Sequence, residues 1–267
     1  MSQKILVFAG TKQSGKSTSA KFIHGFRMKQ ANSIRTFRLD ENGELLVNAV
    51  FHTDKGTVEQ EAVLDIYRQD REFGKYAVNK IWPFAKVYSF AEELKESAIR
   101  IFGLNPQYVY GSDTDKNQPT TIRWCDIWHV LSDNRKNDII AKYRSEYSKQ
   151  FVTHRELLQD FGTICRAFKN SCWIDACFSK IRDEGFPFCI IDDCRYENEV
   201  DVSLNEGADI VLLTKQPFKD SHMSERIHDV DRNKFSYILD NENMTLDEKN
   251  QELVKVLTMF GWNTGTI

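Results

Sequence analysis

The amino-acid sequence predicts an α/β fold in which a parallel sheet carries helices on both faces. Short apolar runs alternate with segments of helical periodicity along most of the chain. The chain opens with an apolar run, a glycine-bounded loop and a helical segment. Segment 32–84 departs from this alternation and has the pattern of a β-rich insertion. Alternation of strands and helices is typical of a parallel sheet, so we expect one domain over residues 1–267.

The glycine-bounded loop runs from Gly10 to Ser17 and has the full GxxxxGK[ST] spacing. It follows the apolar run Ile5–Ala9 and precedes a predicted helix over Thr18–Phe26. The glycines let backbone N–H groups face phosphate oxygens, and the helix N-terminus adds partial positive charge. A surface turn rich in Gly and Lys is the alternative, but the strand and helix around the loop disfavour it. We therefore predict a P-loop NTPase-type sheet.

Each residue type in this loop suits the binding of a nucleoside triphosphate. The Lys16 ammonium can reach the β- and γ-phosphates, and the Ser17 hydroxyl can ligate Mg²⁺. The loop thus predicts ATP and Mg²⁺ as cofactors. The residues expected to bind the ATP phosphates are Gly10, Ser14, Gly15, Lys16 and Ser17.

The insertion over residues 32–84 contains a hairpin signal. Two strand-like runs, Arg35–Leu39 and Leu45–Phe51, flank an Asn42-Gly43 turn, and a further turn is expected at Asp54–Gly56. We predict a β-rich subdomain here. Its pattern indicates no function.

The remaining elements restore the alternation. Further strands are expected at Lys86–Phe90, Phe188–Ile191, Ala208–Leu213 and Phe235–Leu239. Further helices are expected at 90–102, 135–147, 155–168, 173–181, 197–206 and 246–260. The stretch Tyr110–Pro119 is polar and turn-rich, and we expect segment 104–150 to form a lid or substrate-side region. Ligands of such sheets lie beyond the carboxyl ends of the strands.

Composition excludes several classes of protein. Hydrophobic residues make up 41% of the chain and aromatic residues 12%, which argues against disorder. The net charge of −3 leaves no broad basic surface for a nucleic-acid polymer. The six cysteines form no CxxC pair and their neighbours suggest buried positions, so we expect a reducing, cytoplasmic compartment. No apolar run approaches the ~20 residues of a membrane span, and the N-terminus lacks a signal-peptide pattern. A homodimer is left open.

A second cluster of chemistry-bearing residues follows the run Cys189–Ile191. Asp192 and Asp193 come at the end of this run and resemble a Walker B element when paired with the loop. One carboxylate is expected to hold Mg²⁺, with Ser17 and Asp192 as metal ligands, and the other to orient a substrate. Ordinary turn acids are the alternative. Arg195 lies near the same sheet edge, where its guanidinium suits either bidentate phosphate binding or a surface salt bridge.

Phosphoryl transfer needs several cations, because the migrating group spreads its negative charge over three oxygens. Any single cation in a loop is more often solvated, so the prediction is that a subset gathers on the phosphates. Trp173 can stack on a base or pack in the core. The cations near predicted loops are Lys12, Lys95, Lys116, Arg123, Arg155 and Arg166.

Several segments together resemble the bacteriophage deoxynucleoside monophosphate kinases of the P-loop NMP-kinase group. The matching segments are Gly10–Ser17, Tyr88–Lys95, Arg155–Thr163 with Trp173, and Ile191–Glu199. Weaker matches are Tyr110–Asn117 with Arg123-Trp124, and Asp220–Glu225. The loop specifies only the superfamily, whereas the DDxRxxxE and LLQxFGT stretches together are much more specific.

This resemblance implies transfer of the ATP γ-phosphoryl group to a deoxynucleoside 5′-monophosphate, giving the diphosphate, in the supply of DNA precursors for phage replication. It implies that Gly15, Lys16, Ser17 and Thr18 bind ATP phosphates. The residues implied to line the monophosphate site are Lys12, Lys95, Lys116, Arg155, Thr163, Trp173, Asp193, Arg195 and Glu199. The chain departs from the family at Ile164, where an Asp is frequent, and in the 32–84 insertion, which not all members share.

The residues by themselves agree with this mechanism. An acceptor phosphate is already ionised at neutral pH and needs no strong general base, so catalysis is positioning and charge stabilisation. We expect Lys16, Asp193 and Arg195 to be the catalytic residues. Rival readings are a kinase of another small acceptor, such as a nucleoside or coenzyme precursor, a P-loop ATPase or nucleotide switch, and a structural phage component that binds nucleotide without turnover.

Overall fold

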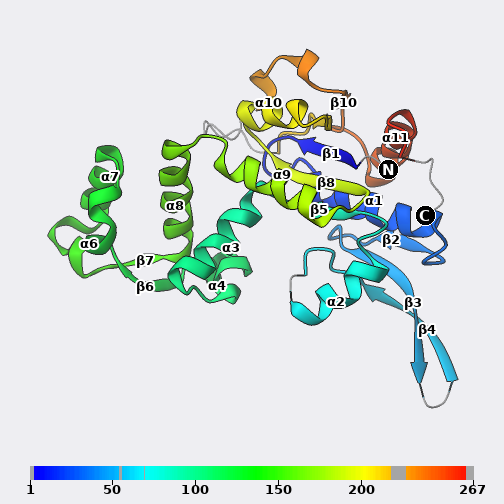
Figure 1. The fold of residues 1–267 in the computed structure, drawn as a ribbon, viewed down its shortest axis with the longest axis horizontal. Helices are drawn as coiled ribbons and strands as arrows, with labels where there is room; N and C mark the ends of the chain where they lie inside the picture. Colours follow the sequence, from blue (N-terminus) through cyan, green and yellow to red (C-terminus); the bar gives the residue numbers. More distant parts are fainter. Residues whose placement is uncertain (1–2, 54–55, 69, 218–226, 263–267) are drawn as a thin grey trace. The chain divides into compact units, whose positions relative to one another are not determined.

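A computed structural model describes residues 3–53, 56–68, 70–217 and 227–262 (Figure 1). The chain divides into two compact units. The first comprises Met1–Ser89 and Cys177–Ile267, and the second comprises Phe90–Ala176. The first unit contains the predicted parallel sheet, and the second is mostly helical.

The sheet of the first unit has five parallel strands in the order β10-β9-β1-β8-β5. The strands are β1 (Lys4–Ala9), β5 (Lys86–Tyr88), β8 (Phe188–Cys194), β9 (Asp209–Leu213) and β10 (Tyr237–Leu239). Central strand β1 pairs on both sides, with Val7 opposite Ile191 and Ile210. The predicted α/β fold is confirmed. Strand β8 is longer than predicted and includes Asp192 and Asp193 within its carboxyl-terminal end.

Helices flank this sheet and close its core (Figure 1). They are α1 (Lys16–Gln30), α9 (Cys172–Glu184), α10 (Glu197–Asn205) and α11 (Leu246–Met259), with the 3-10 turn η4 (Arg232–Lys234). The boundary between the two units falls within α9. Phe8 of β1, Ile23 of α1 and Leu253 of α11 are fully buried in one cluster. Strand β1 reads as a continuous apolar run because both of its faces are covered.

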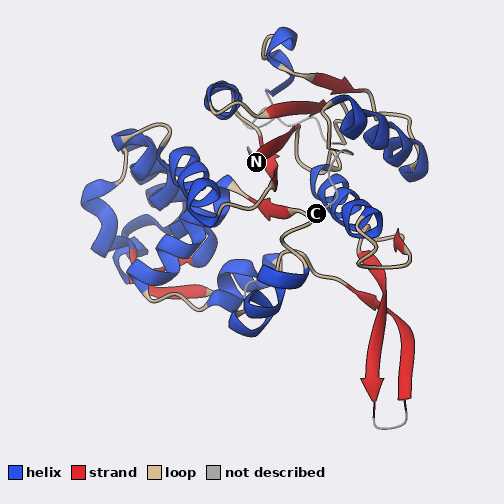
Figure 2. Ribbon diagram, turned by 45° about the vertical axis from the view of Figure 1, so that its right-hand side comes forward, coloured by secondary structure: helices blue, strands red, loops and turns tan. Residues whose placement is uncertain are grey.

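The insertion forms an antiparallel sheet in the order β2-β3-β4, followed by a helix. Its elements are β2 (Phe37–Leu39), β3 (Leu45–Thr53), β4 (Gly56–Val63) and α2 (Arg71–Lys80). The predicted hairpin is confirmed, with Phe37 opposite Val47. Figures 1 and 2 show the β3–β4 ribbon extending away from the parallel sheet.

Two elements of the insertion were not predicted. Strand β4 was missed because nearly all of its side chains are exposed, so it lacks the alternation of a half-buried strand. Helix α2 stands beside the strands of the predicted β-rich insertion; it is amphipathic, and Asp70 caps its start by accepting from the Phe73 amide.

The second unit packs helices around a core of its own. Its helices are α3 (Phe90–Phe102), α4 (Pro106–Tyr110), α5 (Asp113–Lys116), α6 (Trp124–Ile127), α7 (Asp133–Tyr143) and α8 (His154–Phe168), with η1 (Trp128–Val130) and η2 (Arg144–Lys149). Fully buried Trp124 and Val152 and nearly buried Leu157 lie in its core. The strand pair β6 (Pro119–Arg123) and β7 (Phe151–Thr153) was not predicted, because each strand is too short to show a period.

Two further findings bear on composition. In the described part of the chain no helix is long and apolar enough to cross a membrane. All six cysteines are free thiols, and Cys177, Cys189 and Cys194 are buried. Cys125 is exposed, which corrects the expectation that the cysteines occupy buried packing positions.

Candidate active site

The phosphate-binding loop connects β1 to α1 in the predicted way. Gly15 directly precedes α1 with a φ of +100°, a left-handed conformation that favours glycine. A Cβ on Gly10 would lie 2.5 Å from Ser14 Oγ, so this position also needs glycine. The Lys16 ammonium donates 2.6 Å hydrogen bonds to the backbone carbonyls of Gly10 and Thr11. The Lys16 ammonium is therefore held beside the backbone at the start of the loop.

Three predicted site residues at or just after the end of β8 act electrostatically on Lys16; they are Asp192, Asp193 and Arg195. The pKa of Lys16 is lowered from 10.5 to about 8, first by burial and then by the positive charge of Arg195. The charges of Asp192 and Asp193 act in the opposite direction. The structure thus brings Lys16, Asp192, Asp193 and Arg195 together, as the sequence predicted.

The two predicted metal ligands, Ser17 and Asp192, lie close together, since the Ser17 hydroxyl lowers the pKa of the Asp192 carboxyl group. Asp192 is 5% exposed, and burial together with the charge of Asp193 raises the pKa of its carboxyl group to about 6. The hydrogen bond from Tyr67 and the nearby Ser17 hydroxyl oppose that rise in pKa. A buried carboxylate beside a second carboxylate favours a bound cation, and oxygen donors suit Mg²⁺.

This donor set fits a magnesium ion that is also ligated by phosphates. Within the described residues, no group of three or more His, Cys, Asp or Glu side chains could hold a metal. Protein sites for Mg²⁺ in phosphoryl-transfer enzymes usually supply one or two carboxylates, and substrate phosphates and water complete the shell. Ser17 and Asp192 match that pattern.

Side chains around Asp193 and Arg195 fix the end of β8. The Ser89 hydroxyl donates a 2.6 Å hydrogen bond to Asp193 Oδ2. The Glu199 carboxylate accepts from the backbone amides of Arg195, at 2.6 Å, and Tyr196, at 3.1 Å. Glu199 therefore stabilises the turn between β8 and α10, which places the Arg195 guanidinium.

Two loop residues from the prediction have different surroundings. The side chain of Lys12 is exposed on the loop. Thr18 is partly buried and lies against the insertion, since a Cβ on Gly43 would be 3.1 Å from Thr18 Oγ1. The start of α1 is thus in contact with the first turn of the insertion.

Three predicted cations gather in the second unit. The pKa of Lys116 is lowered by burial and by the positive charges of Lys95 and Arg155. Arg155 is oriented by hydrogen bonds to Asp113 Oδ1 at 2.6 Å and to Asn117 Oδ1 at 3.2 Å. Like charges that lie close together favour binding of an anion, and a phosphate suits a guanidinium held in this way.

Trp173 and Thr163 occupy another part of the second unit. The Trp173 indole donates to the Gly162 carbonyl at 3.3 Å, and its ring centroid lies 5.6 Å from that of Phe161. Thr163 is exposed, and its hydroxyl donates to the Gln159 carbonyl one turn earlier at 2.8 Å. Trp173 is half-buried, so one part of the ring packs and the rest stays accessible.

Comparison with known proteins decides the family. A family model described as deoxynucleotide monophosphate kinase matches residues 4–251 of the 267-residue chain. The chain belongs to the deoxynucleotide monophosphate kinase family. The comparison with curated proteins gives no match. The match confirms the predicted resemblance and the predicted activity, phosphorylation of deoxynucleoside monophosphates with ATP.

Three residues that contact the candidate nucleotide site of this kinase were missed in the sequence. Tyr67 comes from the insertion, and its hydroxyl lies 2.5 Å from Asp192 Oδ2. Asn241 Nδ2 donates to the Ser14 carbonyl at 2.8 Å, and Lys249 Nζ lies 3.5 Å from the Gly15 carbonyl oxygen. Only Asn241 had a sequence signal, its position just after a strand. The other two are distant in sequence and belong to no motif.

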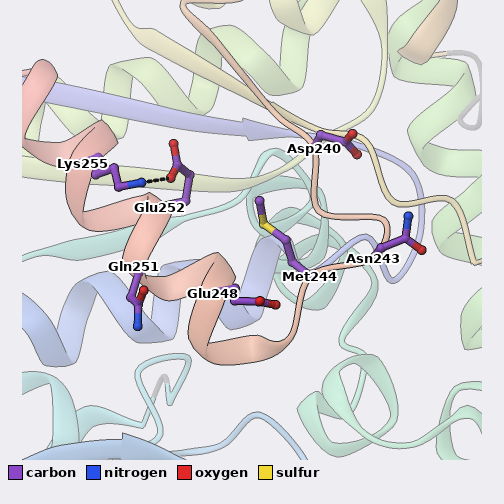
Figure 3. Close-up of a pocket in the computed structure, with 7 residues that line it drawn as sticks. All are labelled: Asp240, Asn243, Met244, Glu248, Gln251, Glu252 and Lys255. Carbon is purple, nitrogen blue, oxygen red and sulfur yellow. Dashed lines mark hydrogen bonds and ion pairs between the residues drawn. The ribbon is translucent and has the colours of Figure 1, made fainter.

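The same C-terminal segments form a surface pocket in the kinase (Figure 3). Its lining residues are Asp240, Asn243, Met244, Glu248, Gln251, Glu252 and Lys255. Three carboxylates and one ammonium contribute to the lining, and that ammonium is paired with Glu252 at 2.6 Å. The acidic lining disfavours a phosphate, so we assign no nucleotide to this pocket.

The predicted site residues of the kinase form two groups, one in each unit. The first unit carries Gly10, Lys12, Ser14, Gly15, Lys16, Ser17, Thr18, Asp192, Asp193, Arg195 and Glu199. The second unit carries Lys95, Lys116, Arg155, Thr163 and Trp173. The weaker family match Asp220–Glu225 lies outside the described residues.

Proposed function

We propose that this kinase transfers the γ-phosphoryl group of magnesium-bound ATP to the phosphate of a deoxynucleoside monophosphate at the P-loop of the first unit. The observation that supports the proposal is that Asp192, Asp193 and Arg195 lie close enough to Lys16 for their charges to act on it. The pKa of Lys16 responds to all three of the other charges. The two cations of this set would pair with the phosphates of a bound nucleotide, and the two carboxylates would pair with a bound metal.

Each side chain has a distinct task in this mechanism. Lys16 exchanges the carbonyls of Gly10 and Thr11 for the β- and γ-phosphates of ATP. Ser17 and Asp192 would hold Mg²⁺, which when bound neutralises charge on the β- and γ-phosphate oxygens. Arg195 stabilises the charge of the migrating group, and Asp193, anchored by Ser89, orients the acceptor side. No general base is required, because the acceptor phosphate is already ionised.

The second unit is proposed to bind the acceptor. Lys95, Lys116 and Arg155 contribute the positive charge that a monophosphate needs, and Trp173 offers a face to its base. By position in the family motif, Thr163 is a further acceptor-binding residue of this unit. By the same motif, Lys12 and Glu199 of the first unit are proposed as acceptor-binding residues. We place the reaction in the synthesis of DNA precursors during phage replication.

The proposal is tested with the purified full-length chain and a panel of acceptors. Phosphoryl transfer from ATP is measured with each deoxynucleoside monophosphate, with nucleosides and with a phosphorylated coenzyme precursor, in Mg²⁺ and in EDTA. We expect one or more deoxynucleoside monophosphates to be preferred, and the rate to vanish in EDTA. Preference for a nucleoside, rapid ATP hydrolysis without any acceptor, or full activity in EDTA would each reject it.

A further inference from the structure

Tyr67 brings the insertion into contact with the candidate magnesium site. Its hydroxyl donates to Asp192 Oδ2 at 2.5 Å. The Ser17 hydroxyl lies close enough to both groups to lower the pKa of the Tyr67 phenol and that of the Asp192 carboxyl group. The three side chains therefore lie together, and two of them are the candidate metal ligands while the third is supplied by the insertion.

The backbone of the insertion fixes the position of Tyr67. The Tyr67 amide donates to Asp65 Oδ1 at 2.9 Å, and the Leu64 amide donates to the Leu45 carbonyl at 2.8 Å. Ile66, the residue between, is 5% exposed and lies in the insertion core with Leu45. A tight turn closed by an Asp side chain is a well-defined local structure. The phenol is thus held by its own turn and by the packing beside it.

The insertion also fits closely against α1, the helix that carries Ser17. A Cβ on Gly25 would lie 2.4 Å from the Phe37 ring, so the absent side chain allows this approach. Lys21 on the same helix pairs with Glu44 at 2.7 Å, and its ammonium lies 5.9 Å from the centre of the Tyr67 ring. One helix thereby carries the contacts that position the insertion and the hydroxyl that would ligate the metal.

Packing alone does not account for the phenol. A phenylalanine would fill the space of the ring, yet the hydroxyl is directed at the one buried carboxylate that would hold Mg²⁺. Groups that hydrogen-bond to a metal ligand fix its orientation, and their loss typically weakens metal binding. The arrangement at Asp192 has this form.

We propose that Tyr67 is a positioning residue for the magnesium site, and that the insertion serves this kinase by supplying it. The Tyr67 hydroxyl holds one carboxylate oxygen of Asp192, so that the carboxylate keeps a single orientation toward Ser17. This inference rests on the proposed use of Mg²⁺, and it assigns a role to segment 32–84 that the family motifs do not cover.

The test is the effect of metal on nucleotide affinity. Binding of a non-hydrolysable ATP analogue is measured by calorimetry with the wild type and with Tyr67→Phe, in excess Mg²⁺ and in EDTA. In the wild type we expect Mg²⁺ to strengthen binding. In Tyr67→Phe we expect the gain from Mg²⁺ to fall by roughly 10-fold, with the affinity in EDTA unchanged. A purely structural role would lower both affinities alike.

Matched variants make each outcome decisive. Tyr76→Phe is the control, because Tyr76 lies in the same insertion on α2 and is 60% exposed; it should bind like the wild type. Asp192→Asn shows how far the gain in affinity from Mg²⁺ falls when a metal ligand is lost. Tyr67→Met also lacks the hydroxyl, and it replaces Tyr67→Phe if that variant does not fold. We expect the same loss of the gain from Mg²⁺ in Tyr67→Met. A normal response to Mg²⁺ in either Tyr67 variant overturns the inference. No response in the wild type instead rejects the magnesium part of the proposed function.

Discussion

The side-chain amide of Asn241 donates a 2.8 Å hydrogen bond to the backbone carbonyl of Ser14, 227 positions earlier in the chain. The same Asn241 side chain accepts from the Lys215 amide at 3.0 Å, so it ties the ends of two neighbouring strands to the loop. Lys249, on α11, lies 3.5 Å from the next carbonyl, that of Gly15. The phosphate-binding loop is therefore supported from behind by the C-terminal part of the chain.

Lys249 should make stability depend on pH. Its pKa is lowered from 10.5 to about 8 by burial and by the charge of Lys215, and no described residue forms an ion pair with it. Below pH 8 it is charged in both folded and unfolded states, so the cost of burying the charge is fully present. Between pH 8 and 10.5 the folded state releases the proton first, so the free energy of unfolding rises with pH.

We therefore expect Lys249→Met to be more stable than the wild type at pH 7, by up to about 3 kcal/mol, the value of the pKa shift. The advantage should shrink toward pH 10. Urea unfolding at several pH values measures it, with Lys255→Met as the control, because the Lys255 side chain is 73% exposed. We also expect weaker ATP binding, because a cation next to the loop is removed. A variant that is less stable than the wild type at pH 7 would contradict this account.

Lys16→Ala should abolish most of the activity and leave the fold intact. Among the described residues, the Lys16 ammonium hydrogen-bonds only to two loop carbonyls and one hydroxyl, and its charge is already destabilised by burial. We expect the rate of phosphoryl transfer to fall by roughly 100-fold or more, as for loss of a transition-state donor. Steady-state kinetics and thermal unfolding are measured on the same preparation. A folded variant with near-normal turnover would remove Lys16 from the mechanism.

Arg195→Ala should affect the acceptor more than ATP. The guanidinium lies close enough to Lys16 to lower the pKa of that lysine, and Glu199 holds the Arg195 backbone. We expect kcat/KM for the deoxynucleoside monophosphate to fall by the equivalent of about 1.5–3 kcal/mol, which is the free energy that a hydrogen bond to a charged group contributes. Equilibrium ATP binding should change far less. Arg232→Ala, at an exposed site of the same unit, is the control. Equal loss of ATP affinity would count against this role.

In the second unit, Asp160→Asn should lower stability. Asp160 is 8% exposed and receives three hydrogen bonds of 2.9 to 3.1 Å from the guanidinium of Arg135. Removing one partner of such a pair leaves a poorly solvated charge, which costs about 3 kcal/mol where both partners are buried. Arg135 is 27% exposed, so the loss should be smaller. Thermal unfolding compares this variant with Asp138→Asn, an exposed acid on α7. Equal melting temperatures would show that the pair contributes nothing.

Much of the fold followed from local pattern. The apolar run and glycine loop predicted β1, the loop and α1, because a parallel strand that is covered on both faces is continuously apolar. The amphipathic repeat over residues 155–168 predicted α8 almost to the residue, and Thr153 and Glu156 form its capping box. Strand β4 and the β6–β7 pair were missed, since their side chains show no period that a single sequence can reveal.

The candidate site divides in the same way. The spacing of Gly10, Gly15, Lys16 and Ser17, and the two acids at the end of an apolar strand, are local signals that predicted the nucleotide-binding chemistry. The DDxRxxxE and LLQxFGT stretches are local signals too, and they predicted the family. Tyr67 and Lys249 entered only through tertiary structure. Tyr67 meets Asp192 across 125 positions, and Lys249 meets Gly15 across 234. A sequence motif records which groups can bind phosphate; which distant side chains hold them in place is decided by packing, because such contacts depend on how separate elements meet.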